Sequence, residues 1–514
     1  CLIISYPSPS HYSSLPPGGV LWYNVSDFGG FMTSKSNSHL SFLDKAGYGS
    51  ASAGDSLIYG LTGMFMMFFL TTVAGIQPAV AGFMSAIGSI YSMVFYPVMG
   101  YVSDQFRSKY GRRRPLLIVS AIPFGLFTFL LFTNVDMPPG AKAVYYTIIM
   151  VILWTWYGVF YVPYTAMGTL YTTDYDEQAK LRLYASFFNM TGVAISMITP
   201  TLLASMFEKA GMTTDQSWSL VGAIIGTCAA VAVMVSGLAS KKFDKGCSTK
   251  IATLKPTDDP ADGADQPADS KTNKLNPVSM IKEYIEVVKI KPMISLIIAS
   301  FLPLIGYSIL MSDIIYFLTY NCMVTAAVAS LFLVMRPCIS ACLIPLVSKL
   351  IEATDKRETL LIFYGVGSAG LIAFKFITPD CIPLIVIYIF FATVLTCIYW
   401  QVVVMLFYDV CEYDRIINGR NREGAIVSFQ GLIDSCAEGI GVWILGIVLQ
   451  FSGFNGEALA QSATALTWIH NCATWLPVIF FVAGGLVLMK YPLSRKYMAK
   501  LQNQEIQNQE RGRL

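Results

Sequence analysis

Charged residues are scarce in this chain: Asp, Glu, Lys and Arg make up only 13% of its 514 residues, whereas a soluble domain carries about 25%. There are three His, and the eleven Cys show no metal-ligand spacing, so neither a metal centre nor a cofactor is expected. The chain also has no Walker loop, no nucleophile elbow and no H-E-x-x-H motif. We therefore expect no ATPase, hydrolase or metallopeptidase, and no enzyme.

Apolar runs, by contrast, are abundant, and hydrophobic residues make up 54% of the chain. A hydrocarbon core about 30 Å thick is crossed by roughly 20 apolar residues in a helix. Stretches of this length predict an all-α membrane protein with twelve transmembrane helices, at 50–76, 78–102, 115–135, 144–170, 183–207, 218–240, 293–318, 324–348, 359–379, 382–408, 425–451 and 466–490.

Lys and Arg are unevenly distributed between the segments that join these helices. Of the 35 basic residues, Lys142 and Lys209 fall in outer segments, Arg336 and Lys375 fall within helices, and all the others lie on the side that holds both termini. By the positive-inside rule that side is cytoplasmic, so we expect a multi-pass plasma-membrane protein with both termini in the cytoplasm. The formal charge of +3 then reflects topology, and no nucleic-acid partner is expected.

A polar stretch rich in Pro, Asp, Ala and Ser divides the twelve helices into six plus six. Short matches between the two halves, Val-Ser at 102 and 347 and Ser-Phe at 186 and 428, favour a duplicated six-helix unit. Met32 is an alternative start of the chain. The predicted parts are a polar tail (1–47), a six-helix bundle (48–240), a cytoplasmic linker with an amphipathic helix (241–291), a second bundle (292–490) and a cytoplasmic tail (491–514).

Asp55 is the first of several ionisable residues predicted to lie inside the membrane. Such residues are functional candidates, because a lone charge near the midplane costs about 2.5–3.5 kcal/mol. If the first helix begins near Lys45, Asp55 lies deep within it, and the small residues AGYGSASAG favour this interpretation. If the helix begins at Ser56, Asp55 is an N-cap at the water edge.

Four further ionisable residues lie in helices of the second half. Asp313 and Arg336 are on helices seven and eight, where they could form an ion pair that changes during a functional cycle or one that is only structural. Asp434 and Glu438 are one turn apart on helix eleven and face the same way. Two carboxyl groups that close resist being charged together, which suits a proton carrier, although an aqueous vestibule is the alternative.

Charged loops between helices predict a cytoplasmic gate. The loop GYVSDQFRSKYGRRRP (100–115) has one acid followed by five cations, and the loops at 174–182 and 408–423 contain both signs. Arg–carboxylate pairs tolerate partial desolvation, so we predict ion pairs that break and reform between the halves. The alternative is that these residues only set orientation. The predicted gate residues are Asp104, Arg107, Arg112, Arg113, Asp174, Asp409, Glu412 and Arg422.

Candidate solute contacts come from polar and aromatic residues within helices. Small-molecule pockets combine apolar and aromatic walls with a few polar anchors. Tyr161 and Tyr164 lie in an aromatic-rich helix, and Gln430 lies in the sequence SFQ. Together with Asp55, these residues are the predicted solute contacts.

Several motifs resemble one known family. They are GYGSASAGD, LTTVAGI, YPVMGYVSDQFRSKYGRRRP, VPYTAMGTLYTTD, KPMISLIIASFLP, IIYFLTY, YDVCEYD and REGAIVSFQGLIDS. From about Lys45 to Lys500 the chain is similar to the glycoside–pentoside–hexuronide:cation symporters, the melibiose-permease-like branch of the major facilitator superfamily. The resemblance implies a twelve-helix alternating-access carrier of two pseudo-symmetric six-helix bundles, with a sugar site between the halves and Na⁺, Li⁺ or H⁺ as coupling ion.

The family's functional residues carry over only in part. Asp55 matches the first-helix carboxylate that binds sugar hydroxyls in the family. The positions of the cation-binding carboxylates of helices two and four are instead Ser92, Tyr96 and Tyr161, the helix-five Arg is Ser186, and the helix-eleven Lys corresponds to Ser435. A hard cation prefers several oxygen ligands, usually including carboxylate. Either the ion site has moved, the coupling ion is H⁺, or coupling has been lost.

We therefore expect a monomeric secondary transporter that moves a small solute, a sugar or glycoside, together with a cation, with H⁺ favoured over Na⁺. Proton or ion coupling is assigned to Asp55, Asp313, Arg336, Asp434 and Glu438. One alternative is a uniporter or a carrier of a non-sugar solute. Another, from a different class, is a non-transporting membrane sensor or scaffold, against which the interior charges argue.

Overall fold

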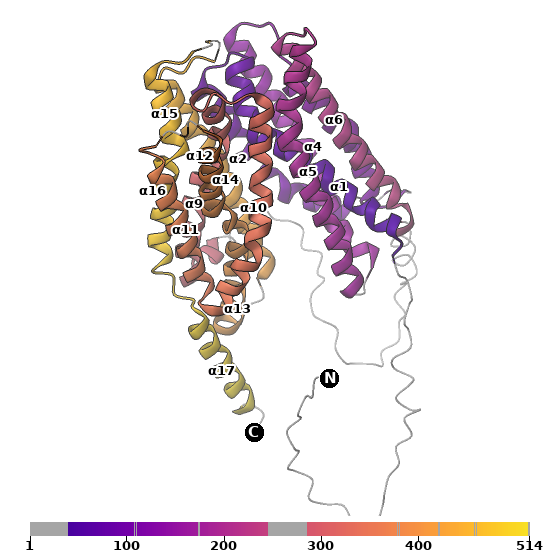
Figure 1. The fold of residues 1–514 in the computed structure, drawn as a ribbon. Coiled ribbons are helices and arrows are strands. Elements are labelled where there is room, and N and C mark those ends of the chain that lie inside the picture. The colour runs from indigo at the N-terminus through magenta and orange to yellow at the C-terminus, as the bar shows by residue number, and fades with distance from the viewer. Residues whose placement is uncertain are drawn as a thin grey trace, which may run out of the picture. The chain divides into compact units, whose positions relative to one another are not determined.

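The computed structural model describes residues 40–106, 108, 110–172, 175–244, 285–377, 379, 381–419, 422–456, 458 and 460–511, and residues 41–514 form one compact unit. Every element described in these ranges is a helix (Figure 1). In chain order they are α1 (Phe42–Phe68), the π-helical turn η1 (Phe69–Val73), α2 (Pro78–Gln105), α3 (Arg114–Leu131), α4 (Pro139–Tyr171), α5 (Tyr175–Lys209), α6 (Thr214–Ala239), α9 (Lys291–Tyr316), the π-helical turn η2 (Phe317–Asn321), α10 (Ala326–Ala353), α11 (Lys356–Ala373), α12 (Ile382–Cys397), α13 (Tyr399–Asn418), α14 (Glu423–Phe451), α15 (Ala463–Ala473), α16 (Trp475–Leu488) and α17 (Arg495–Arg511).

Among the described residues, eleven helical segments are long and apolar enough to cross a membrane. The predicted helix at 359–379 corresponds to α11, which is not among them. It has only 18 residues and begins with Lys356, Arg357 and Glu358, so its charge offsets its apolar remainder. The structure confirms the all-α membrane class.

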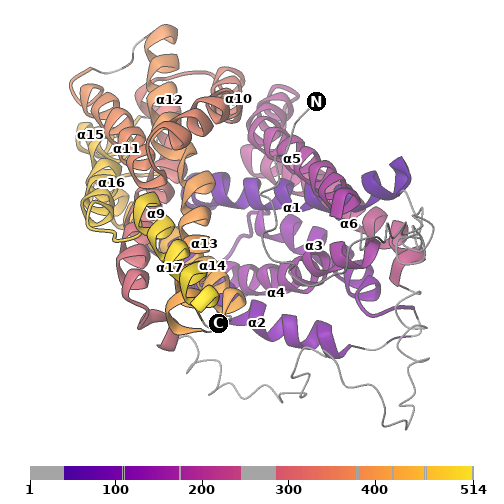
Figure 2. The same ribbon diagram turned by 90° about the horizontal axis from the view of Figure 1, so that it is seen from below.

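The helices form two groups, which we call the N-half (α1–α6) and the C-half (α9–α16). Figure 2 shows the indigo-to-magenta helices of the N-half beside the orange-to-yellow helices of the C-half. We call the end of the bundle where α6 ends and α9 begins the linker end, and the opposite end the far end. Residues 245–284, with most of the predicted amphipathic helix, lie outside the described residues.

The two halves share an unusual local feature. The first helix of each half, α1 or α9, runs directly into a π-helical turn, η1 or η2. π-Helical turns are rare in proteins, and those that occur are often found at functional sites. Their equivalent positions support the duplicated unit that the sequence favours.

The start of α1 decides where Asp55 lies. The Ser41 hydroxyl accepts a hydrogen bond from the Asp44 N–H (3.2 Å), and the Asp44 carboxylate accepts one from the Ser41 N–H (3.3 Å). This capping box begins the helix at Phe42. Asp55 therefore lies about 20 Å along α1, at 1.5 Å per residue. It is an interior residue of the helix and not its N-cap.

Glycines allow α2 and α14 to meet closely at the far end. A Cβ atom on Gly446 would lie 2.3 Å from the Pro78 carbonyl oxygen, and one on Gly82 would lie 2.9 Å from the Trp443 Cα. Because these neighbours are backbone atoms, they cannot turn away as a flexible side chain can. The two halves can therefore approach this closely only because Gly82 and Gly446 have no side chain.

Hydrogen bonds also join the halves at the far end. The Thr71 and Tyr316 hydroxyls lie 2.6 Å apart, as do those of Thr201 and Ser330. The Ala79 N–H donates to the side-chain carbonyl of Gln450 (3.0 Å). The far end is thus the closed end of the interface.

Candidate functional site

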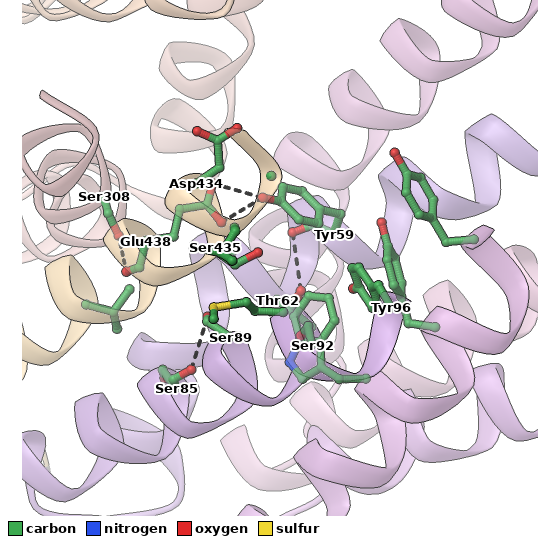
Figure 3. Close-up of a pocket in the computed structure, with 18 of the residues that line it drawn as sticks. Tyr59, Thr62, Ser85, Ser89, Ser92, Tyr96, Ser308, Asp434, Ser435 and Glu438 are labelled. Carbon is green, nitrogen blue, oxygen red and sulfur yellow. Dashed lines mark hydrogen bonds between the residues drawn. The ribbon is translucent and has the colours of Figure 1, made fainter. Parts of the chain in front are cut away.

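A cavity of about 1830 Å³ lies between the two halves. Residues of α1, α2, α4 and α5 line it from the N-half, and residues of α9, α13 and α14 line it from the C-half (Figure 3). It reaches from Met67 on the far-end side of α1 to Ile285 and Lys289, just before α9 at the linker end. Since the halves are joined at the far end, the cavity opens toward the linker end.

Three carboxylates line the cavity, and each accepts a hydrogen bond from a tyrosine. The pairs are Tyr157 with Asp55 (2.5 Å), Tyr59 with both oxygens of Glu438 (2.8 and 2.9 Å) and Tyr399 with Asp434 (3.0 Å). Figure 3 shows Tyr59 reaching Glu438 from the opposite wall. The other two pairs each lie within one half, so only Tyr59–Glu438 connects a carboxylate of one half to the other.

Stacked tyrosine rings fill the region where the resemblance places cation-binding carboxylates. Tyr157 and Tyr161 stack with centroids 5.4 Å apart at 19°, and Tyr96 lies 6.0 Å from Tyr157 at 27°. The Ser92 hydroxyl donates to the Gly88 carbonyl of its own helix (2.7 Å). Asp55 is therefore the carboxylate at this wall among the described lining residues.

Much of the remaining wall is apolar and deformable. The lining includes six methionines, which fill irregular space and adapt to different shapes: Met64, Met66, Met67, Met93, Met197 and Met311. Trp154 and Trp400 add large flat rings, and Asn189 adds an amide that donates to the Ser56 hydroxyl (2.5 Å). A solute with both apolar and hydroxyl-bearing faces matches these walls.

The predicted solute contacts separate into two groups. Asp55 and Tyr161 line the cavity. Tyr164 is only 5% exposed, lies outside the described lining, and shares a hydrogen bond with the Ser52 hydroxyl (2.6 Å). Gln430 is also buried outside that lining, with its side chain beside Asp434. The structure thus places Tyr164 and Gln430 behind the wall.

The predicted ion pair between Asp313 and Arg336 is not formed in this structure. Asp313 is fully buried, and neither carboxylate oxygen has a hydrogen-bond partner among the described residues. Arg336 instead donates to the Met311 sulfur and to the Thr396 hydroxyl (3.1 Å). Residues 311 and 313 point about 160° apart on a helix, so the face of α9 that meets Arg336 is not the face that carries Asp313.

Two of the predicted gate residues, Arg112 and Arg113, make hydrogen bonds to other parts of the N-half. The backbone N–H groups of Arg112, Arg113 and Arg114 all donate to the buried carboxylate of Asp244, at 3.0, 3.1 and 2.8 Å. The Arg113 side chain donates to the Ala166 carbonyl. Asp244 thus fixes the loop before α3 against the end of α6. Its negative charge is also favourable at the N-terminus of α3.

Described ion pairs at the linker end also stay within one half. In the C-half they are Arg422 with Asp414 (2.7 Å) and Glu286 (3.4 Å), Lys356 with Asp409 (2.6 Å) and Arg415 with Glu412 (3.8 Å). In the N-half Lys45 pairs with Glu177 (2.9 Å). The side chains of Asp104, Arg107 and Asp174 lie outside the described residues. Among the described side chains, these ion pairs at the open end of the cavity join residues of the same half, and the predicted exchange of partners between halves stays a prediction.

Several residues at the site were not singled out from the sequence. Tyr59, Tyr399, Asn189 and Asp244 are ordinary in the sequence, because their partners lie between 35 and 379 positions away. The Asp434–Glu438 spacing was the one available signal for the acidic wall. Tyr59 lies four residues after Asp55, and this spacing places both on one face of α1.

Known proteins of similar sequence include symporters and sugar carriers. The chain is 24% identical to an uncharacterized symporter, YnaJ, of Bacillus subtilis (strain 168), covering 90% of this chain and 95% of that protein. It is 24% identical to the isoprimeverose transporter of Lactiplantibacillus pentosus (88% and 89% covered). It is 22% identical to the glucuronide carrier protein homolog of Escherichia coli (strain K12) (90% and 94% covered).

Solved structures share the fold at low sequence identity. The nucleoside transporter NupG matches with a TM-score of 0.62 at 12% identity, covering 87% of this chain and 98% of that one. A bacterial homolog of the human lysosomal transporter Spinster, in an inward-facing conformation, matches with a TM-score of 0.61 at 14% identity (87% and 96% covered).

The MFS/sugar transport protein family matches residues 47–495. This range runs from the second turn of α1 to the start of α17 and so includes every residue of the cavity wall described above. The chain is an integral multi-pass membrane protein and a transporter, not an enzyme. It belongs to the MFS/sugar transport protein family.

Proposed function

We propose that this protein is a proton-coupled symporter of an uncharged sugar or glycoside that works by alternating access. The observation that carries the proposal is the cavity between the halves, closed at the far end and walled by carboxylates and aromatic rings. Carboxylates accept hydrogen bonds from sugar hydroxyls, and rings pack against the apolar faces of a sugar or its aglycone. The isoprimeverose transporter among the relatives is a carrier of this solute class.

Charge favours a neutral solute. The charged residues in the described lining are Asp55, Asp434, Glu438 and Lys289, and Lys289 lies at the linker end. A hexuronide that reached the carboxylates would meet like charge, and the described lining places no cation next to them, which is costly. The solute is therefore an uncharged glycoside and not a hexuronide.

Proton coupling is favoured by what replaces the family's cation-binding carboxylates. Ser92, Tyr96 and Tyr161 occupy those positions, and the two tyrosines lie with their rings 6.3 Å apart. Na⁺ prefers several oxygen ligands with carboxylate among them. A carboxylate that takes up a proton needs no such cage.

Most basic residues lie at the linker end of the helices. The positive-inside rule makes that end cytoplasmic. The structure then represents an inward-open state of a plasma-membrane protein, with both termini in the cytoplasm. In the outward-open state, the charged linker-end residues Arg112, Arg113, Asp409 and Glu412 exchange partners between halves.

Uptake into proteoliposomes tests the proposal. Purified full-length protein is supplied with radiolabelled isoprimeverose, raffinose or glucuronide, and a proton or a sodium gradient is imposed separately. We expect isoprimeverose or raffinose to accumulate with the proton gradient alone, and glucuronide to be excluded. Uptake that ignores both gradients contradicts symport, and absence of uptake for every sugar contradicts sugar transport.

A second candidate is a carrier of an amphipathic solute that is not a sugar. The six methionines of the wall favour it, because such surfaces bind apolar groups of varied shape. Thermal stabilisation of the purified protein by amphipathic solutes, with no stabilisation by the three sugars, would support this candidate over the first.

A further inference from the structure

We propose that Glu438 carries the coupling proton and that Tyr59 is the positioning residue that holds its charged form between the two halves. The inference rests on the proposed symport function and deepens it by assigning the proton to one of three carboxylates.

Glu438 lines the cavity and lies beside a close contact between the two halves. Asp434 and Ser435, one turn earlier, line the cavity. Gly439, the next residue, already packs against α2, where a Cβ atom would lie 3.0 Å from the Ala86 Cα. A change in the charge of Glu438 therefore acts next to a contact between the halves.

The hydrogen bond from Tyr59 gives Glu438 a role that the other carboxylates lack. Tyr59 lies on α1 and donates to both oxygens of Glu438 on α14, at 2.9 and 2.8 Å. Asp55 accepts from Tyr157 within the N-half, and Asp434 accepts from Tyr399 within the C-half. The charge on Glu438 thus alters a contact between halves, whereas the charges on the other two alter contacts inside a half.

The surroundings of Glu438 contain acids and phenols but no described cation in contact. The titratable groups that face it are Tyr59 (α1), Tyr96 (α2), Tyr307 (α9), Tyr399 (α13) and Asp434 (α14). The Ser308 hydroxyl donates to the Glu438 backbone carbonyl (2.7 Å) and fixes α14 against α9. Among the described residues, Tyr59 is the phenol that donates to the Glu438 carboxylate, and Asp434 beside it carries like charge, so a charged Glu438 depends on the Tyr59 hydrogen bonds.

The proton step is simple to write. A hydronium ion of the cavity gives its proton to one carboxylate oxygen of Glu438 and becomes a water molecule, so one O–H bond forms as another breaks. Tyr59 keeps its own proton throughout. The neutral acid can no longer accept from Tyr59 with both oxygens, so the contact between halves weakens and no net charge is enclosed when the loaded cavity closes.

Tyr59 serves the return of the empty carrier. Without solute or proton, the cavity must close around a charged Glu438, and the Tyr59 hydrogen bond compensates the lost hydration. Loss of Glu438 and loss of Tyr59 therefore have different consequences. The first removes coupling, and the second slows only the empty return.

Two transport assays on reconstituted protein separate these effects, with radiolabelled isoprimeverose as the probe. A gradient of one pH unit supports about tenfold accumulation for one proton per sugar. We expect Glu438→Gln to lower this ratio to about one while measurable counterflow persists. We expect Tyr59→Phe to slow net uptake more than counterflow, and its matched control Tyr399→Phe to change both equally. Tenfold accumulation by Glu438→Gln would overturn the assignment.

Infrared spectroscopy tests the same assignment without a sugar. Acidification of the purified protein gives a protonated-carboxyl band for each group that titrates. We expect Glu438→Gln to remove one band, Tyr59→Phe to shift that band, and Tyr399→Phe and Asp434→Asn to leave it in place. If no band is lost in Glu438→Gln, Glu438 takes up no proton, even where sugar uptake by the wild-type protein upholds the proposed function.

Discussion

The N-half and the C-half contribute different chemistry to the same cavity. The N-half brings one carboxylate, Asp55, set beside stacked tyrosine rings. The C-half brings two carboxylates one turn apart, Asp434 and Glu438, each bonded to a tyrosine. The two six-helix halves thus give the cavity an aromatic wall and an acidic wall.

The difference also extends behind the walls. Two ionisable side chains, Asp313 and Arg336, are buried in the C-half without pairing to one another. In the N-half, the buried acids Glu177 and Asp244 are held by a lysine and by backbone N–H groups at the linker end. The C-half also has a buried acid that is held at the linker end, Asp414 with Arg422 (2.7 Å), but it differs in that Asp313 and Arg336 lie inside the membrane and do not pair with one another. The proposed roles follow this difference, with solute contact mainly at Asp55 and proton chemistry in the C-half.

Asp55→Asn gives the largest effect expected from the N-half. The amide keeps the size of the side chain but removes the charge that accepts from Tyr157 and that is proposed to accept from a solute hydroxyl. Hydrogen bonds to charged groups contribute about 1.5–3 kcal/mol, so we expect uptake of labelled isoprimeverose to fall at least about tenfold. The control is Asp136→Asn, at an exposed position between α3 and α4. Near-normal uptake by Asp55→Asn would remove Asp55 from the solute site.

Gly446→Leu tests the closed far end that both halves share. Its Cβ would lie 2.3 Å from the Pro78 carbonyl oxygen, so α2 and α14 must separate. We expect uptake to fall about tenfold, because a change of about 1.4 kcal/mol in the free-energy difference between the inward-open and outward-open states corresponds to a factor of ten. Hydrogen–deuterium exchange in peptides covering 77–89 and 439–451 should rise. Gly365→Leu, where a side chain meets open space, is the matched control and should change neither measurement.

Much of this fold follows from local pattern, and much of the site does not. Apolar length and basic loops suffice to predict the helices, because each membrane helix satisfies its own backbone. The one-turn spacing of Asp434 and Glu438 likewise predicts an acidic face. Tyr59 could not be assigned to Glu438, since 379 positions separate them and only the packing of α1 near α14 brings them together. The direction of Asp313 away from Arg336 depends on helix rotation, which composition does not encode.

A double-mutant cycle sharpens the contrast in buried charge. We expect Asp313→Asn and Arg336→Met to change the free energy of unfolding additively, within about 0.5 kcal/mol, because the two side chains share no contact in this state. Denaturant titration in mixed micelles gives the four values of the cycle. An interaction energy above about 1 kcal/mol would mean that the pair forms in a populated state.

The smallest effect is expected for Tyr164→Phe, which distinguishes the wall of the cavity from the layer behind it. The Tyr164 hydroxyl is hydrogen-bonded to the Ser52 hydroxyl, and Tyr164 is 5% exposed. The substitution therefore removes one neutral hydrogen bond worth about 1 kcal/mol. That loss acts mainly on stability, and we expect uptake to change less than about threefold. Tyr157→Phe is the matched comparison, because Tyr157 lines the cavity and donates to Asp55. If Tyr164→Phe impairs uptake as strongly as Tyr157→Phe, the solute reaches behind the aromatic wall and the N-half contributes a deeper site than this conformation contains.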